Sequence, residues 1–414
     1  MLIFRNIIIV LCVYLFQGLF EEIGISSILF KFISESLLIL LLMPFISRIS
    51  LNSNKIKIII IFILYLISII FSIMYNDNPA YIIYNYSRFS LYGIIIFLLS
   101  QEIVYSPDRT KKIMTFLVKI HVIQVVAALI NSSFLTSPLE RKVGTMSSSG
   151  GSLATIYTMF MAPFFLSHFM YTKEKKYLWY YITTILVGLA SGKRAVAFFF
   201  IVISIITYFK IFHKKFNIFK LFFLFSGLLI LFNFAILNVS FGNNKMSDTF
   251  NILENINIAL EYGLEYSSNT DKYGFSMGRS STTQNVIRYF YDANTTDFLF
   301  GFGPETLMGE IKFKTLNILY GIVGWSKEFI SLGFLGFMMY LILVFRLKNN
   351  VKDLSWSNTN LYHNSLLIGV KMGYITWLIT FFLYSNSFQD QGIPLFILLF
   401  IHGYLLASKK SIQI

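Results

Sequence analysis

The chain has 414 residues, of which 56% are hydrophobic and only 13% are charged, and its formal net charge is +14 at pH 7. This composition excludes an ordinary soluble domain and is typical of a polytopic membrane protein. Cys12 is the single cysteine, which excludes an intrachain disulfide and a cysteine metal cluster. The positive charge does not indicate nucleic-acid binding, because most basic residues lie in the short loops between apolar segments.

About twelve apolar segments of roughly 20 residues predict an all-α polytopic membrane protein with about twelve transmembrane helices. The first segment is not followed by a small-residue cleavage site, so we expect it to be retained as a membrane span. In chain order the segments are 4–20, 27–47, 57–74, 82–100, 113–134, 151–171, 177–190, 195–212, 218–240, 327–345, 364–384 and 391–408.

The loops between these segments alternate in charge. One set is rich in Lys and Arg, whereas the intervening set carries acidic or neutral residues such as Glu21, Glu22 and Asp390. Basic loops of membrane proteins lie in the cytoplasm, so both chain termini are expected there. The basic loops fall within 48–57, 109–112, 173–176, 210–220, 346–352 and 409–410.

This topology divides the chain into three parts: 1–240 with the first nine helices, 241–326 as one large extracytoplasmic loop, and 327–414 with the last three helices. A loop of this length is usually functional or disordered, and its helix signals favour a folded one. Asp248 precedes apolar residues at helical spacing. Residues 280–282 can cap a second helix, which would carry Val286, Ile287, Phe290 and Tyr291 on one face.

After this second helix, residues 298–305 contain Gly301 and Gly303 and predict a tight glycine turn near the membrane surface. The whole loop is therefore expected to form a partly amphipathic cap over the bundle.

Three arginines lie on the outer face, where the charge rule disfavours them. Arg194 lies in the short break 191–195, Arg279 follows a glycine in the large loop, and Arg141 precedes the sixth segment. A guanidinium gives permanently charged, bidentate bonds to phosphate, so these residues suit a lipid pyrophosphate. Arg279 is expected just before a helix N-terminus, which also favours an anion. The alternative for each arginine is a headgroup anchor at the interface.

Other candidates are less specific. Arg88 and Lys31 fall within apolar segments, where Lys31 has Glu35 as a partner one helical turn away. Glu305 and Glu328 are the carboxylates best placed to activate an acceptor hydroxyl, or they are solvated cap residues. The five histidines are scattered without metal-ligand spacing, so no metal site is predicted. The full prediction names Arg194, Arg279, Glu305 and Glu328 as catalytic, and Arg141, Lys142, Lys193, Arg88 and Arg288 as substrate-binding.

In the order of its motifs, the region from residue 135 to 345 resembles the O-antigen polymerase and ligase superfamily of bacterial polysaccharide assembly. One departure is that the Asn-Pro-Asn usual in that family is replaced here by Ser148, Ser149 and Gly150. The matching elements are Arg141–Thr145, the basic break Ser191–Ala195, Gly278-Arg279, the turn Gly301–Pro304, and Gly333-Phe334-Leu335-Gly336.

The resemblance implies a GT-C-like glycosyltransferase of the bacterial inner membrane, with undecaprenyl-diphosphate-linked oligosaccharide as donor and acceptor. It implies that Arg194 and Arg279 engage the donor pyrophosphate, with Arg141 assisting, so no metal or cofactor is required. Membrane lipids and a chain-length regulator are the further expected partners. The predicted reaction transfers the growing O-antigen or capsule chain to a new lipid-linked repeat.

Two alternatives stay open. The ligase branch typically has a His-Asn pair at the end of the long loop, but this chain has Val323 and Gly324 there and no His within 241–326. A flippase or transporter of lipid-linked oligosaccharide would show charge through the bundle and often repeated halves, and no such repeat is seen. These observations favour a polymerase.

Overall fold

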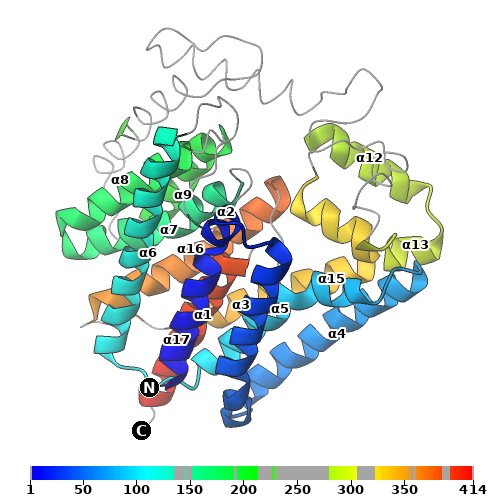
Figure 1. The fold of residues 1–414 in the computed structure, drawn as a ribbon, viewed down its shortest axis with the longest axis horizontal. Helices are drawn as coiled ribbons and strands as arrows, with labels where there is room; N and C mark the ends of the chain where they lie inside the picture. Colours follow the sequence, from blue (N-terminus) through cyan, green and yellow to red (C-terminus); the bar gives the residue numbers. More distant parts are fainter. Residues whose placement is uncertain are drawn as a thin grey trace.

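The computed structural model describes residues 2–134, 145, 152–190, 194–212, 226–227, 230, 279–304, 322–352, 354, 356–357, 360–384 and 392–412. Within these ranges every regular element is a helix (Figure 1). The elements are α1 (Leu2–Leu15), α2 (Gln17–Glu22), α3 (Ser27–Leu42), the 3-10 helix η1 (Met43–Arg48), α4 (Ser53–Tyr75), α5 (Tyr81–Ser100), α6 (Pro107–Phe134), α7 (Ser152–Thr172), α8 (Lys175–Ala190), α9 (Arg194–Phe212), α12 (Arg279–Tyr291), α13 (Thr295–Phe300), α15 (Gly324–Lys352), α16 (Leu361–Leu383) and α17 (Gly392–Ile412).

Each predicted apolar segment coincides with one or two of these helices, apart from 218–240, which falls almost entirely outside the described residues. Among the described residues, 6 helices are long and apolar enough to cross a membrane. They are Ile28–Arg48, Ser53–Tyr75, Tyr81–Ser100, Pro107–Ile130, Gly324–Lys352 and Leu361–Leu383, and Leu2–Leu15, Phe199–Ile211 and Gly392–Ser408 are shorter apolar helices. The chain is therefore an all-α protein with the helices of a membrane protein.

The outer surface of the helices agrees with this assignment. Large apolar side chains face outward along α3 and α4: Phe32 is 69% exposed, Leu40 71% and Met74 68%. In water such rows would be unfavourable, whereas in a bilayer they contact lipid tails. The buried faces of most of the helices share one continuous apolar core.

The bundle brings segments that are distant in sequence side by side. Helices α1, α3, α5 and α17 lie together, α7 packs between α8, α9 and α16, and α15 packs along α4 (Figure 1). Both chain ends lie at one end of this arrangement, and α12 and α13 lie at another part of the surface, beside α15. The elements from the predicted outer loop therefore rest directly on a long apolar helix.

The second predicted loop helix is present as α12, but its buried face differs from the prediction. Val286 and Phe290 are buried, whereas Ile287 is 58% and Tyr291 89% exposed. Positions four apart share one face of a helix, so Thr282, Val286 and Phe290 form the packed stripe and the residues after them are rotated away. The helix predicted after Asp248 lies outside the described residues.

Candidate functional site

The turn after α13 and a kink in α15 meet backbone to backbone. Gly301 has φ 76° and Gly333 has φ 63°, both in the left-handed region that favours glycine. A Cβ at Gly301 would lie 2.4 Å from the amide nitrogen of Gly333, and a Cβ at Gly333 would lie 2.4 Å from that of Gly301. The predicted glycine turn is confirmed. Its close contact with Gly333 is a new observation, and we call this contact the glycine crossing.

Hydrogen bonds fix the crossing to the end of α4. The Phe302 N–H donates to the carbonyl of Ile330 at 2.8 Å, and the Asn76 side chain donates to the carbonyl of Gly301 at 3.1 Å. Ser72 Oγ donates to the carbonyl of Ser331 at 2.6 Å, next to the kink where the helical ladder is interrupted. The bonds to Ile330 and Ser331 give partners to carbonyls next to the kink, so they anchor the first turns of α15 to the turn after α13 and to α4.

Glu328 lies on these first turns and is completely buried. Its Oε2 accepts hydrogen bonds from the hydroxyl of Tyr65 in α4 at 3.3 Å and of Tyr86 in α5 at 3.2 Å. Two donors on one carboxylate oxygen fix the orientation of the side chain. The sequence prediction gave Glu328 direct contact with an acceptor sugar. Its zero exposure argues against that role and favours a role in joining α4, α5 and α15.

Arg279 is the first residue of α12, rather than the residue before the helix. Its guanidinium carbon lies 4.5 Å from the centre of the Tyr384 ring, a cation–π contact with the residue that ends α16. The Tyr384 ring is buried and contacts the Phe199 ring of α9, with 6.1 Å between centroids. Arg279 is therefore held at the junction of three helices.

The same junction lies near the start of α9, which begins at Arg194. Phe199 follows Arg194 by five residues, a rise of about 7.5 Å along the helix. The helix that Arg194 begins is therefore one of the three helices at the junction that holds Arg279, although the two residues are far apart in sequence. The side chain of Arg194 lies outside the described part of the structure.

Arg88 forms a separate ionic cluster between α5 and α3. Its Nη1 donates to Oε1 of Glu35 at 3.0 Å, and the hydroxyl of Tyr84 donates to the other oxygen of that carboxylate. Lys31 donates instead to Oδ1 of Asn85. The predicted direct pairing of Lys31 with Glu35 is wrong, because the carboxylate turns across to α5 where Arg88 offers a charged donor.

The remaining candidates do not join these groups. Arg288 is exposed in the last turn of α12, about 13 Å along the helix from Arg279. The other four candidates, Arg141, Lys142, Lys193 and Glu305, lie outside the described residues. No group of three His, Cys, Asp or Glu side chains in the described part is arranged to hold a metal ion. Metal-independent chemistry therefore stays a prediction.

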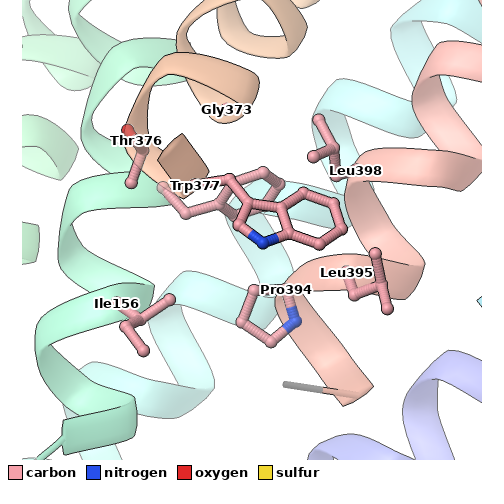
Figure 2. Close-up of a pocket in the computed structure, with 8 residues that line it drawn as sticks. Ile156, Gly373, Thr376, Trp377, Pro394, Leu395 and Leu398 are labelled. Atoms are coloured by element: carbon pink, nitrogen blue, oxygen red, sulfur yellow. The ribbon is translucent and has the colours of Figure 1, made fainter. Parts of the chain in front are cut away.

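A small apolar pocket of about 20 Å³ lies between α7, α16 and α17. Figure 2 shows the indole of Trp377 over this space, with Ile156 on α7 and Pro394, Leu395 and Leu398 on α17. Trp377 Nε1 donates to the hydroxyl of Tyr340 at 3.1 Å. The lining is suited to hydrocarbon, and its indole wall is tied into the core of the bundle.

Sequence reasoning missed the tyrosines that organise the site: Tyr65 and Tyr86 on Glu328, and Tyr384 under Arg279. A tyrosine within an apolar segment needs a partner for its hydroxyl when it is buried, and this signal could have marked Tyr65 and Tyr86. Nothing in the sequence indicates which carboxylate they meet.

Comparison with known proteins adds no family assignment. No protein-family model matches the chain, and no curated protein sequence matches it. The resemblance to the O-antigen polymerase and ligase superfamily therefore rests on the order of the short motifs, two of which meet in the glycine crossing.

Proposed function

We propose that this chain is a polysaccharide polymerase of the bacterial inner membrane, in a GT-C-like fold with about twelve transmembrane helices and both termini in the cytoplasm. It transfers a growing glycan from undecaprenyl diphosphate to a new lipid-linked repeat on the outer face. The observation that carries the proposal is the position of Arg279 on Tyr384, beside the helix that Arg194 begins.

This arrangement supports pyrophosphate binding for three physical reasons. Arg279 supplies a planar guanidinium with bidentate geometry, and it begins a helix whose first N–H groups and dipole favour an anion. The Tyr384 ring orients the guanidinium without neutralising its charge. Helix α9, which begins at Arg194, contacts the same Tyr384 through Phe199, and we propose that Arg194 adds the second arginine of the pair.

The chemistry follows from charge development. When the bond between the anomeric carbon and the pyrophosphate breaks, negative charge grows on the leaving group while the sugar carbon becomes cationic. Arginines that bind this charge more tightly than the ground state lower the barrier, by about 3–4 kcal/mol per donor in comparable sites. The acceptor hydroxyl attacks the anomeric carbon, and its proton passes to a base. Glu305 is the candidate base, and Glu328 positions α15.

The test is a polysaccharide ladder from a strain lacking this gene, complemented with wild type, Arg194→Ala or Arg279→Ala at matched protein levels. We expect the deletion and both variants to leave only single-repeat glycan. Long polymer still attached to the lipid carrier in the deletion would identify a ligase, and an unchanged ladder would favour transport or a scaffold. Arg5→Ala, at the exposed start of α1, serves as the matched control.

The topology has its own test. A reporter fused at residue 270 is expected to lie outside the cytoplasm. The segments before and after the large loop lead to the basic loops 210–220 and 346–352, which are expected in the cytoplasm. Reporter activity in the cytoplasm would contradict both the topology and the outer-face mechanism.

A further inference from the structure

The cluster around Arg88 carries more positive than negative charge inside a segment long enough to span a membrane. Lys31 and Arg88 contribute two positive charges, and Glu35 contributes one negative charge. The other polar groups at this place include Tyr84, Tyr92 and Asn85, which are neutral. A net charge of about +1 near the end of an apolar span favours the binding of a further anion.

The cluster is reached from the lipid side of the bundle. Arg88 is 23% exposed, Tyr84 is 38% exposed, and the neighbouring apolar residues Ile28 and Phe32 of α3 are 79% and 69% exposed. Lys31 and Arg88 follow the starts of α3 and α5 by about 6 Å and 10 Å along each helix. In the proposed topology these helix starts are at the outer face, so the charges lie at the depth of lipid headgroups.

The cations also keep donors to spare. Glu35 occupies Nη1 of Arg88, while Nε of Arg88 is buried and has no hydrogen-bond partner among the described residues. A guanidinium has five N–H donors and an ammonium has three, so one carboxylate and one amide oxygen leave most of them unused. A buried donor without an acceptor is destabilising. A group with several anionic oxygens would satisfy these donors and the excess charge together.

This cluster is distinct from the buried Glu328 on the other side of α5. Tyr86 and Arg88 are two residues apart on α5, which turns their side chains by about 200°. Tyr86 reaches Glu328 of α15 on one side, and Arg88 reaches Glu35 of α3 on the other. The body of α5 therefore separates the two places.

We infer that the ionic cluster between α3 and α5 is a second anion site, at which Arg88 and Lys31 hold the diphosphate of a membrane lipid. This inference rests on the proposed function: a polymerase holds two lipid diphosphates at once, and the Arg88 cluster takes that of the acceptor. Glu35 orients Arg88 and balances part of the positive charge of the site when no lipid is bound.

Native mass spectrometry tests this by counting bound lipids. The full-length protein is released from phosphatidylcholine nanodiscs that contain undecaprenyl diphosphate. Wild type is expected to hold two molecules, and Arg279→Gln to retain one. Arg88→Gln and Lys31→Gln are expected to retain one molecule and to bind the second about ten-fold more weakly. Arg5→Gln and Lys176→Gln, which remove exposed cations elsewhere, should behave as wild type.

The outcomes separate this inference from the proposed function. One bound molecule that depends on Arg279 alone would overturn the second site and leave the polymerase proposal standing. No bound molecule at all would overturn both. Two further samples test other phosphate ligands: nanodiscs that contain phosphatidylglycerol, and added inorganic pyrophosphate. If either one occupies the Arg88-dependent site as fully as undecaprenyl diphosphate does, the assignment of that site to the acceptor lipid is overturned.

Glu35→Gln provides a test that misfolding does not imitate. The amide oxygen can still accept from Arg88 and the amide nitrogen can donate to the hydroxyl of Tyr84, but the competing negative charge is gone. Binding of the second undecaprenyl diphosphate is expected to become several-fold tighter. Weaker binding in this variant would contradict the inference.

Discussion

The two sides of α5 contact two carboxylates, Glu328 and Glu35, whose surroundings differ in burial and in charge. On the Tyr86 side, Glu328 is completely buried and accepts from two neutral phenols, beside the glycine crossing. On the Arg88 side, Glu35 meets a guanidinium that is partly exposed on the surface of the bundle. Two residues of one helix therefore contact a closed polar core and a partly exposed ionic cluster.

The difference shows how a buried carboxylate and a ligand site can be told apart. Phenols from two helices fix Glu328 in place, and a ligand would have to displace helices to reach it. The Arg88 cluster has surplus charge, surplus donors and a route from the lipid, which are the properties of a site that exchanges an anion. Four predictions test this division, in order of decreasing effect on stability.

Gly333→Ala is expected to have the largest effect, because its Cβ would enter the backbone at Gly301 and Leu299. Together with the left-handed φ, this should cost on the order of 3–5 kcal/mol and abolish monodisperse protein in size-exclusion chromatography. Gly24→Ala is the matched control: Gly24 has φ 91° with nothing within 4 Å of a new Cβ, so only about 1 kcal/mol should be lost. Equal amounts of monodisperse protein from the two variants would show that the glycine crossing is not closely packed.

Glu328→Ala is expected to destabilise the protein by about 3 kcal/mol, because it leaves a cavity and removes the acceptor of two phenols. Glu328→Gln keeps an accepting oxygen and should cost about 1 kcal/mol. Thermal unfolding in detergent measures the difference. Full loss of polysaccharide synthesis in a stable Glu328→Gln protein would contradict the positioning role and favour direct catalysis.

Arg88→Gln should cost about 1–2 kcal/mol, less than removal of a fully buried partner, because the side chain is 23% exposed. Combining it with Glu35→Gln should recover part of this loss, since no unpaired carboxylate remains. A double-mutant cycle on thermal unfolding measures the coupling. If the stability losses of the two single variants simply add in the double variant, the ion pair does not join α3 to α5.

Removing single hydroxyls gives the smallest effects and the closest comparison. Tyr86→Phe takes one donor from the buried carboxylate and should cost about 1–1.5 kcal/mol. Tyr84→Phe takes a donor from Glu35 at the partly exposed site and should cost about 0.5 kcal/mol, since water and Arg88 compensate. A larger loss of stability in Tyr84→Phe than in Tyr86→Phe would contradict the assignment of the Glu328 side as closed and the Arg88 side as open.

Hydropathy alone predicted the helices well, because each apolar segment must form its hydrogen bonds within itself in lipid. The closely spaced Gly301 and Gly303 predicted the turn at Gly301, because glycine adopts the left-handed backbone that such turns require. Hydropathy could not find the partner of that turn, because Gly333 lies within an apolar segment that reads as continuous helix. The kink is visible only from the close approach of the two backbones.

The candidate site was predicted in part. Arg279 and Arg88 were recognised as charges in unfavourable places, which is a local property of the sequence. Their partners, Tyr384 and Glu35, depend on how distant helices pack, and the one-turn spacing of Lys31 and Glu35 suggested the wrong pair. Glu328 was recognised as a carboxylate near the loop, but its burial depends on how α15 packs against α4 and on the tyrosines that it meets there.

The central claim is that Arg279 binds a lipid pyrophosphate during glycan transfer, and the rate of that transfer by purified protein tests it most directly. The assay supplies lipid-linked repeats and follows products of two or more repeats, with Arg5→Lys as control. The account predicts that wild type extends the glycan and that Arg279→Lys and Arg194→Lys are each slower by about 100-fold, because an ammonium does not replace the guanidinium fork. Transfer by both variants within two-fold of wild type would contradict it.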